Sequence, residues 1–333
     1  MDMMNTLAEL VSAFGPSGAE KGISSVIGKV ASQYCDEVSR DAMGNLICHK
    51  KGSGPKVMFA AHMDSIGLVA THIDEKGFIH VGAIGGVSPK EVLYTPVCFQ
   101  NGTCGMIGAA EDADIAKLKV ADLFIDIGAA SRDEAERLVR VGDVAVYNTR
   151  TVDASGRMIS PYMDNRVSCL VLLMAMEKLG TVENDLYFVF TSQEEVGIRG
   201  AKTAAWAIDP DYGIAVDVTP ADDEPGSKHL VSSVLGGGAA VKVMDSSVIC
   251  HPQVVEQLMS LAAEKGIKAQ RDVIRAGGTD AGAIHLTRAG VYTSGISIPC
   301  RYIHTPTEMV DKEDVKACAA LVAAFAQAKL EKL

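Results

Sequence analysis

Short apolar runs and longer amphipathic stretches alternate in the second half of the chain. The short runs are rich in β-branched and aromatic residues, which is typical of buried strands, whereas the longer stretches repeat apolar residues at helical spacing. The predicted strands span residues 185–191, 212–217, 240–244 and 291–298, and the predicted helices span residues 164–179, 198–206, 252–265 and 311–330. Because strands that alternate with helices form parallel sheets, we expect an α/β fold with a mostly parallel central sheet flanked by helices.

The N-terminal segment adds elements to this sheet. Two helices are predicted within the first 34 residues, where a Gly-Pro-Ser-Gly turn at residues 15–18 separates them. Strands are predicted near residues 36–40, 45–50 and 57–61, of which the last is the most apolar.

Residues 67–147 have a different pattern of apolar and turn-forming residues. Short apolar runs are separated here by Gly, Asn and Pro, and only residues 133–139 have a plainly helical pattern. Closely spaced strands with turn residues between them predict a small β-barrel or sandwich. The simplest organisation is one α/β domain, residues 1–65 and 156–333, interrupted by a β-rich insert, residues 66–155.

Composition and charge limit the classes of partner. Apolar residues make up 48% and charged residues 22% of the 333 residues, which is typical of a soluble globular protein. A net charge of −11 without a Lys/Arg cluster argues against nucleic acid and anionic membranes as partners. No apolar stretch approaches the roughly 18 residues that span a bilayer, and the N-terminus lacks the pattern of a signal peptide.

The eight cysteines indicate the redox state of the cellular compartment in which the protein is expected. None of them forms a C-x-x-C pair, and most lie in apolar runs. Their even number permits a disulfide framework, but a chain of this length without a signal peptide favours buried, reduced thiols. We therefore expect reduced cysteines and a cytoplasmic protein.

Histidines and acidic residues follow several predicted strands. His62 and Asp64 lie two residues apart on an extended segment, so their side chains would project to the same side. A carboxylate beside a histidine commonly orients a metal-binding imidazole, although this pair alone also fits a structural histidine. Glu194 and Glu195 follow another strand, and neighbouring side chains on an extended segment point apart. We therefore expect the two glutamates to have different roles.

Other candidates each have an ordinary structural explanation as well. Asp164 opens a predicted helix, where aspartate is a preferred N-cap. Asp217 ends a buried strand, where its charge needs a partner and could form a loop salt bridge. His304 lies just past another strand, where a single histidine is more often a structural hydrogen-bonding group. The Gly-Gly-Thr-Asp sequence at 277–280 lacks the lysine and spacing of a P-loop, so we interpret it as a tight turn capped by Asp280.

The whole set is more specific than its members. Functional groups in an open α/β sheet gather outside the carboxyl ends of its strands, and all of these residues are expected at that edge. The candidate metal ligands are His62, Asp164, Glu195, Asp217 and His304. Two imidazoles and three carboxylates suit a pair of divalent ions bridged by one carboxylate, and the histidines favour zinc. Glu194, outside this set of ligands, is then the natural general base.

Seven short segments also carry motifs of a known family. They are residues 60–64 (AAHMD), 123–129 (LFIDIGA), 162–166 (YMDNR), 191–197 (TSQEEVG), 215–217 (AVD), 277–281 (GGTDA) and 297–304 (SIPCRYIH). In this order they closely resemble the M42 family of metallo-aminopeptidases, the glutamyl and tetrahedral aminopeptidase group. The resemblance covers nearly the whole chain.

The resemblance implies a role for each candidate residue. It implies that His62 and Asp217 hold one ion, that Glu195 and His304 hold the other, that Asp164 bridges them, that Asp64 orients His62, and that Glu194 is the catalytic base. It further implies two divalent metal ions per subunit, zinc above cobalt or manganese, and peptide substrates with a free N-terminus. The insert would be a dimerisation domain, and dimers would assemble into a hollow tetrahedral dodecamer.

Two departures and two alternatives remain. Ser65 stands where the family usually has glutamate, and Gly236–Gly238 replace a stretch that more often contains lysine and proline. An M20-type carboxypeptidase, dipeptidase or deacylase uses similar ligands, but its extra domain falls between the last two of them. Here the longest gap lies between His62 and Asp164, which favours M42. A non-catalytic peptide-binding or scaffold homologue would be expected to lack a ligand or the base, and none is missing.

Overall fold

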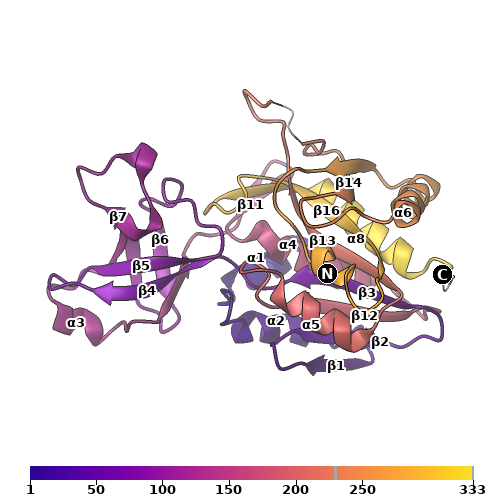
Figure 1. Cartoon of the computed structure of the whole chain (residues 1–333), viewed down its shortest axis with the longest axis horizontal. Helices are drawn as coiled ribbons and strands as arrows, with labels where there is room; N and C mark the ends of the chain where they lie inside the picture. Colours follow the sequence, from indigo (N-terminus) through magenta and orange to yellow (C-terminus); the bar gives the residue numbers. More distant parts are fainter. Residues whose placement is uncertain (229–230, 332–333) are drawn as a thin grey trace.

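A twisted sheet and a separate closed barrel make up the protein, shown in Figure 1 by a computed structural model that describes residues 1–228 and 231–331. Over these residues the sheet has 11 strands, in the order β1-β2-β12-β3-β13-β16-β17-β11-β10 with β14 and β15 branching from β16. The barrel closes through β4-β5-β8-β7-β6-β9. The predicted α/β fold with an inserted β-barrel is therefore confirmed.

The strands have the following bounds. Those of the sheet are β1 (Glu37–Arg40), β2 (Leu46–Lys50), β3 (Lys56–His62), β10 (Val152–Ala154), β11 (Arg157–Ser160), β12 (Asp185–Thr191), β13 (Tyr212–Pro220), β14 (Ala239–Met244), β15 (Ala269–Val273), β16 (Tyr292–Arg301) and β17 (Glu308–Asp311). Those of the barrel are β4 (Gly67–Ile73), β5 (Ile79–Ile84), β6 (Pro96–Phe99), β7 (Cys104–Ala109), β8 (Leu123–Asp126) and β9 (Val144–Tyr147).

Most of the helices pack on the faces of the sheet, and α3 lies in the barrel insert. They are α1 (Met3–Ser12), α2 (Lys21–Ala31), α3 (Arg132–Glu136), α4 (Met163–Glu177), α5 (Arg199–Ile208), α6 (Pro252–Lys265), α7 (Ala281–Ile284) and α8 (Lys312–Ala326), with 3-10 turns at Ile115–Lys117 and Val120–Asp122. None of the helices in the described ranges is long and apolar enough to span a bilayer.

The sheet is parallel at its centre and in the β14–β15 pair that branches from it. The neighbours β12, β3, β13 and β16 run parallel, as predicted, whereas β1, β2, β17, β11 and β10 pair antiparallel at the two sides. Short connections such as the one from β10 to β11 cannot make the crossover that parallel neighbours require. The sheet is therefore mixed, and the parallel centre sets the edge at which polar groups collect.

Strand β3 shows how the sheet divides two apolar cores. Its side chains alternate between faces, so Phe59 and Ala61 pack in the larger core with α1, α2, α4 and α8. Met58 and Ala60 pack on the other face against α5 and α7. A strand buried on both faces needs an uninterrupted apolar run, which is the pattern that the sequence shows here.

One disulfide contradicts the expectation of reduced thiols throughout. Cys98 and Cys104 form a bond that joins strands β6 and β7 of the barrel. The antiparallel register places the two residues directly opposite each other, with their Cα atoms 4.2 Å apart, although six positions separate them in sequence. The other cysteines are free, and all of them except Cys35 are buried.

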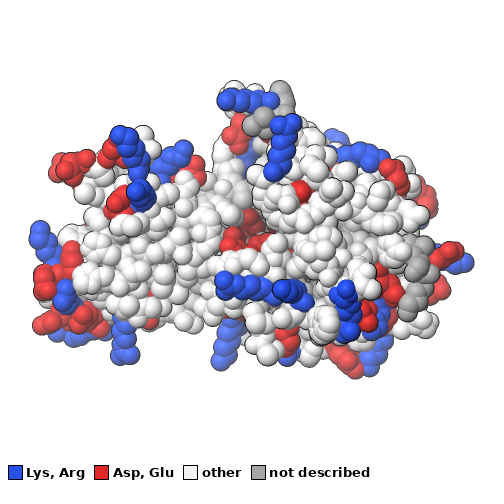
Figure 2. Space-filling view, viewed as in Figure 1, with Lys and Arg blue, Asp and Glu red and all other residues white. Residues whose placement is uncertain are grey.

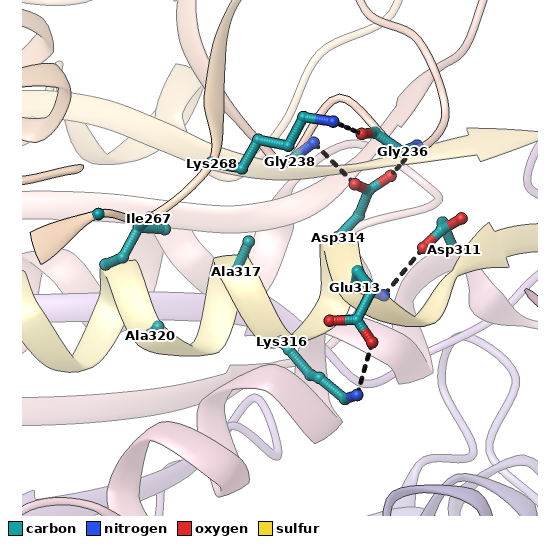
Figure 3. A pocket seen from close by; sticks show the side chains of 11 residues that line it. Gly236, Gly238, Ile267, Lys268, Asp311, Glu313, Asp314, Lys316, Ala317 and Ala320 are labelled. Carbon is teal, nitrogen blue, oxygen red and sulfur yellow. Dashed lines mark hydrogen bonds and ion pairs between the residues drawn. The ribbon is translucent and has the colours of Figure 1, made fainter. Parts of the chain in front are cut away.

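The glycine-rich departure at residues 236–238 forms a tight turn above α8 (Figure 3). Gly236 and Gly238 have φ values of 73° and 85°, which favour glycine, and both backbone N–H groups donate to the Asp314 carboxylate at 2.7 Å. A Cβ on Gly238 would lie only 2.1 Å from the Lys268 carbonyl oxygen. These glycines are therefore required by the local backbone.

Candidate metal centre

The predicted site residues come from different elements and meet at the carboxyl edge of the parallel strands. His62 ends β3, Glu194 and Glu195 follow β12, Asp217 lies within β13, His304 follows β16, and Asp164 lies in the first turn of α4. Together they line a cavity of about 410 Å³. Figure 2 shows acidic side chains gathered in a hollow between the barrel and the sheet.

Asp164 lies between the two histidines. Its Oδ1 is 2.9 Å from His62 Nε2, and its Oδ2 is 3.2 Å from His304 Nε2. Glu195 Oε2 is 3.3 Å from the same His304 nitrogen, whereas Asp217 Oδ1 is 3.7 Å from His62 Nε2. The cluster thus has a His62–Asp217 side and a His304–Glu195 side, with one carboxylate reaching both.

The start of α4 differs from the prediction. Asp164 is not the N-cap, because Tyr162 holds that position and Asn165, the residue after Asp164, is non-helical as well. Its own N–H donates to the Glu308 carboxylate at 2.9 Å, and its side chain points to the histidines. The N-cap explanation for Asp164 is therefore wrong.

Asp64 is fully buried below the cluster. Its two carboxylate oxygens accept the backbone N–H groups of Glu194 at 3.0 Å and Glu195 at 3.2 Å, and the Ser17 hydroxyl donates to it at 2.6 Å. His62 Nδ1 lies 3.2 Å from the Asp64 carbonyl oxygen and 3.6 Å from Oδ1. Since a carbonyl oxygen only accepts, Nδ1 carries the proton and Nε2 faces the cluster. Asp64 therefore holds both His62 and the glutamate pair.

The glutamates diverge for a different reason from the one predicted. The segment after β12 is a turn and not an extended strand, because Gln193 has φ 53° and the N–H of Gly197 donates to the Glu194 carbonyl oxygen. The turn sends Glu195 toward His304 and leaves Glu194 Oε2 3.9 Å from His62 Nε2. The two side chains still face different parts of the cluster.

Two groups that support His304 were not predicted. Glu308 is buried, and its carboxylate accepts the backbone N–H of His304 at 2.7 Å as well as that of Asp164. The Gly86 carbonyl oxygen, from the segment between β5 and β6 of the barrel, accepts the proton of His304 Nδ1 at 3.0 Å. Nothing in the sequence marks either residue, since a single glutamate and a Gly-Gly pair are common in loops.

The turn at residues 277–280 belongs to the wall of the cavity. Gly277, Gly278 and Thr279 line it, whereas the Asp280 side chain makes no capping hydrogen bond to α7. Its carboxylate instead accepts the Thr191 hydroxyl at 2.6 Å. Asp280 thus stands at the N-cap position of α7, but its side chain does not serve as the cap.

Burial and mutual repulsion dominate the electrostatics of the site. Burial raises the pKa of Glu194, and the Asp217 carboxylate raises it further although His62 opposes the shift. Burial also opposes ionisation of Asp164, but hydrogen bonds from His304 and His62 outweigh it and hold the pKa well below its usual value. Burial disfavours a charged His304, yet its contacts with Asp164 and Glu195 raise its pKa to about 12. Among the described residues that line the site, the two histidines are the groups that can offset this negative charge.

These residues fit divalent cations. Ligand atoms of His62, Asp164 and Glu195 all lie within 4.8 Å of one another. Within the described part of the chain, the buried Oε1 of Glu195 also lacks a hydrogen-bond partner. Imidazole nitrogens mixed with carboxylate oxygens suit zinc and its neighbours, whose binding displaces imidazole protons. The site therefore has the donor set of a hydrolase metal centre.

Comparisons with known proteins agree with this class. The profile of the family described as M42 glutamyl aminopeptidase matches residues 44–321. The lysyl aminopeptidase of Pyrococcus furiosus is 37% identical over 98% of this chain and 96% of its own length. The chain belongs to the M42 family of aminopeptidases, which are metallopeptidases.

Solved structures show the same fold. Aminopeptidase APDkam598 from the archaeon Desulfurococcus kamchatkensis has a TM-score of 0.94 at 39% identity, over 98% of this chain and 94% of that one. The Pyrococcus horikoshii TET1 peptidase has a TM-score of 0.89 at 30% identity, over 98% of this chain and 99% of that one. That peptidase can assemble into a tetrahedron or a large octahedral shell.

The family match also decides between the alternatives. The barrel strands lie between His62 and Asp164, and not between Asp217 and His304. This placement and the family match leave the M20-type alternative unsupported. Membership of a peptidase family likewise disfavours a non-catalytic scaffold.

Proposed function

We propose that the clustered residues hold two divalent ions, with zinc preferred, and that the protein removes N-terminal residues from peptides. His62 and Asp217 would hold one ion, Glu195 and His304 the other, and Asp164 would bridge. The observation that supports this most is the Asp164 carboxylate, with one oxygen toward each histidine. Ions bound there would supply Lewis-acid stabilisation of the developing oxyanion and a water of lowered pKa.

Glu194 is the general base in this proposal. Its carboxylate lines the cavity and lies near His62 without lying between the two histidines. It accepts a proton from the attacking water and returns that proton to the amine that leaves. Asp64 positions it, because the Asp64 carboxylate accepts the Glu194 backbone N–H.

Negative charge also suits the substrate's free end. An α-ammonium group that enters this cavity meets carboxylates of the cluster, whereas a blocked N-terminus brings no positive charge. This restricts cleavage to the first peptide bond.

Replacing the base tests the proposal. Glu194→Gln should keep the metal content and the circular dichroism spectrum but lower kcat on a leucine amide by about 10²–10⁴-fold. Glu313→Gln is the matched control, since Glu313 is exposed on α8 and pairs only with surface Lys316 in the described contacts. Near-wild-type turnover of Glu194→Gln would refute the assignment.

The substrate and metal content provide separate checks. Free leucine amide should be cleaved and its N-acetylated form should not, whereas an M20-type deacylase would accept the blocked compound. Two metal ions per chain together with no turnover of any free amide would support the scaffold alternative.

We also propose that the barrel joins subunits, first as a dimer and then as a tetrahedral dodecamer. Large apolar side chains are exposed on it, namely Tyr94, Met106, Ile115, Leu138 and Val141. Large apolar side chains that stay exposed in a single chain can be covered at an interface between chains, and the Pyrococcus horikoshii relative assembles into shells. Light scattering should show a large assembly that Val141→Asp reduces in size, and a monomer at micromolar concentration would contradict the proposal. A cytoplasmic location remains a prediction.

A further inference from the structure

Beyond the metal centre, the wall of the cavity is mostly apolar, although Thr279 also contributes to it. Its apolar side chains are Ile198, Val218, Pro220, Ile274, Ala276 and Ile303. Within the described residues, every charged side chain that lines the cavity belongs to the cluster of predicted ligands and base. A substrate side chain that extends away from the metal centre therefore contacts mainly apolar side chains.

Local backbone geometry fixes part of this wall. Ile198 has φ 54°, a conformation that is costly for a β-branched residue. Its Cδ1 lies 3.7 Å from where a Cβ on Gly278 would be and 3.6 Å from where one on Gly282 would be. These are ordinary contact distances, so the Ile198 side chain lies beside both glycine positions, next to the turn at residues 277–280.

Two arginines close in sequence to residues of the cavity wall are outside its lining. Arg301, the residue most suited to attract an acidic substrate, forms an ion pair with Asp223 at 2.7 Å and does not line the cavity. Arg275 lies between Ile274 and Ala276 in sequence, is exposed, and is likewise outside the lining.

We propose that this wall is the pocket for the substrate's N-terminal side chain, and that it selects aliphatic residues over lysine and glutamate. The inference rests on the proposed peptidase function and adds its substrate class. Leucine buries apolar surface against the wall, whereas lysine or glutamate would lose water without gaining a partner. The metal-centre carboxylates do not serve a lysine side chain, because the bound cations and the substrate's own α-amino group would already occupy them.

The size of the cavity agrees with one side chain and the adjoining backbone. About 410 Å³ lies within the usual range for small-molecule sites, and the residues of the metal centre make up part of its lining. The proposed preference differs from the activity in the name of the Pyrococcus furiosus lysyl aminopeptidase.

A panel of aminoacyl amides tests the preference on zinc-loaded protein. The kcat/KM for leucine amide should exceed those for lysine and glutamate amides by at least about 100-fold. A higher value for lysine or glutamate would overturn the pocket assignment while leaving the peptidase function intact. No turnover of any amide would instead refute the proposed function.

A binding measurement keeps the pocket testable in that case. L-leucine, L-lysine and L-glutamate can be titrated calorimetrically into the zinc-loaded Glu194→Gln variant. Tightest binding of leucine supports the apolar pocket, and equal or tighter binding of either charged amino acid overturns it.

Exposed Ala276 allows the preference to be redirected without disturbing the core. Ala276→Asp should raise the ratio of kcat/KM for lysine amide to that for leucine amide by about 10-fold or more. Ala276→Lys should raise the corresponding ratio for glutamate amide by a similar factor. Unchanged ratios in both variants would place the side chain elsewhere. The neighbouring Arg275→Ala is the control, and a selective fall in glutamate turnover in it would show that Arg275 recognises acidic residues.

Discussion

The contact between the barrel and His304 gives a prediction whose size follows from the structure. In a Gly86→Ala variant, the new Cβ would lie 2.6 Å from His304 Nδ1 and 2.8 Å from Cε1. An ordinary contact begins near 3.4 Å, so the ring has to move by about 0.8 Å or the segment has to withdraw. Such a displacement weakens metal binding by about 10–100-fold and lowers kcat/KM by about 100-fold.

The measurements are a zinc dissociation constant, by competition with a chelator, and kcat/KM on leucine amide. Gly82→Ala is the matched control on β5, where the added Cβ would meet Thr71 and Val69 at 3.4 and 3.5 Å and disturb nothing. The control should behave as wild type in both assays. If Gly86→Ala bound zinc as tightly as Gly82→Ala, the contact would have no role in holding His304.

Three further predictions concern the support of the site and the cysteines. Glu308→Ala removes the acceptor of two backbone N–H groups, those of Asp164 and His304, and should weaken zinc binding by about 10–100-fold in the same competition assay. Cys104→Ser removes the disulfide of the barrel and should lower the free energy of unfolding in urea by about 2 kcal/mol, an effect that a reducing agent should reproduce on the wild type only. Burial raises the pKa of the Cys250 thiol to about 12, so mass spectrometry should find it unlabelled by iodoacetamide in native protein at pH 8 and labelled in urea; native labelling would contradict its burial.

Much of the fold was predictable because its signals are local. The apolar run of β12 and the spacing of α6 gave both elements their observed bounds, since burial on two faces and helical periodicity leave clear patterns. The site residues could be proposed for a related reason. Most of them follow or end a strong element, and parallel strands bring such positions to one edge. Asp164 instead lies in the first turn of α4, and Asp217 lies within β13, which continues past the end predicted for that strand.

What escaped prediction depends on contacts between distant segments. The Gly86–His304 hydrogen bond joins residues 218 positions apart, and Glu308 acts through backbone groups that any sequence supplies. The Cys98–Cys104 bond depends on a strand register within the barrel. The turn at Gln193 replaced the extended segment that had been expected, and yet the two glutamates still diverge.

The same hydrogen bond from Gly86 makes His304 a shared component of two structural units. The His304 side chain comes from the segment that follows β16. Its ring is held by a hydrogen bond to Gly86, in the segment that follows barrel strand β5. Linkage between equilibria is reciprocal, so any partner that fixes the barrel in one position also favours one geometry of the imidazole, and a ligand held by the imidazole favours that barrel position in return. Assembly and metal occupancy would then be coupled through a single proton on Nδ1.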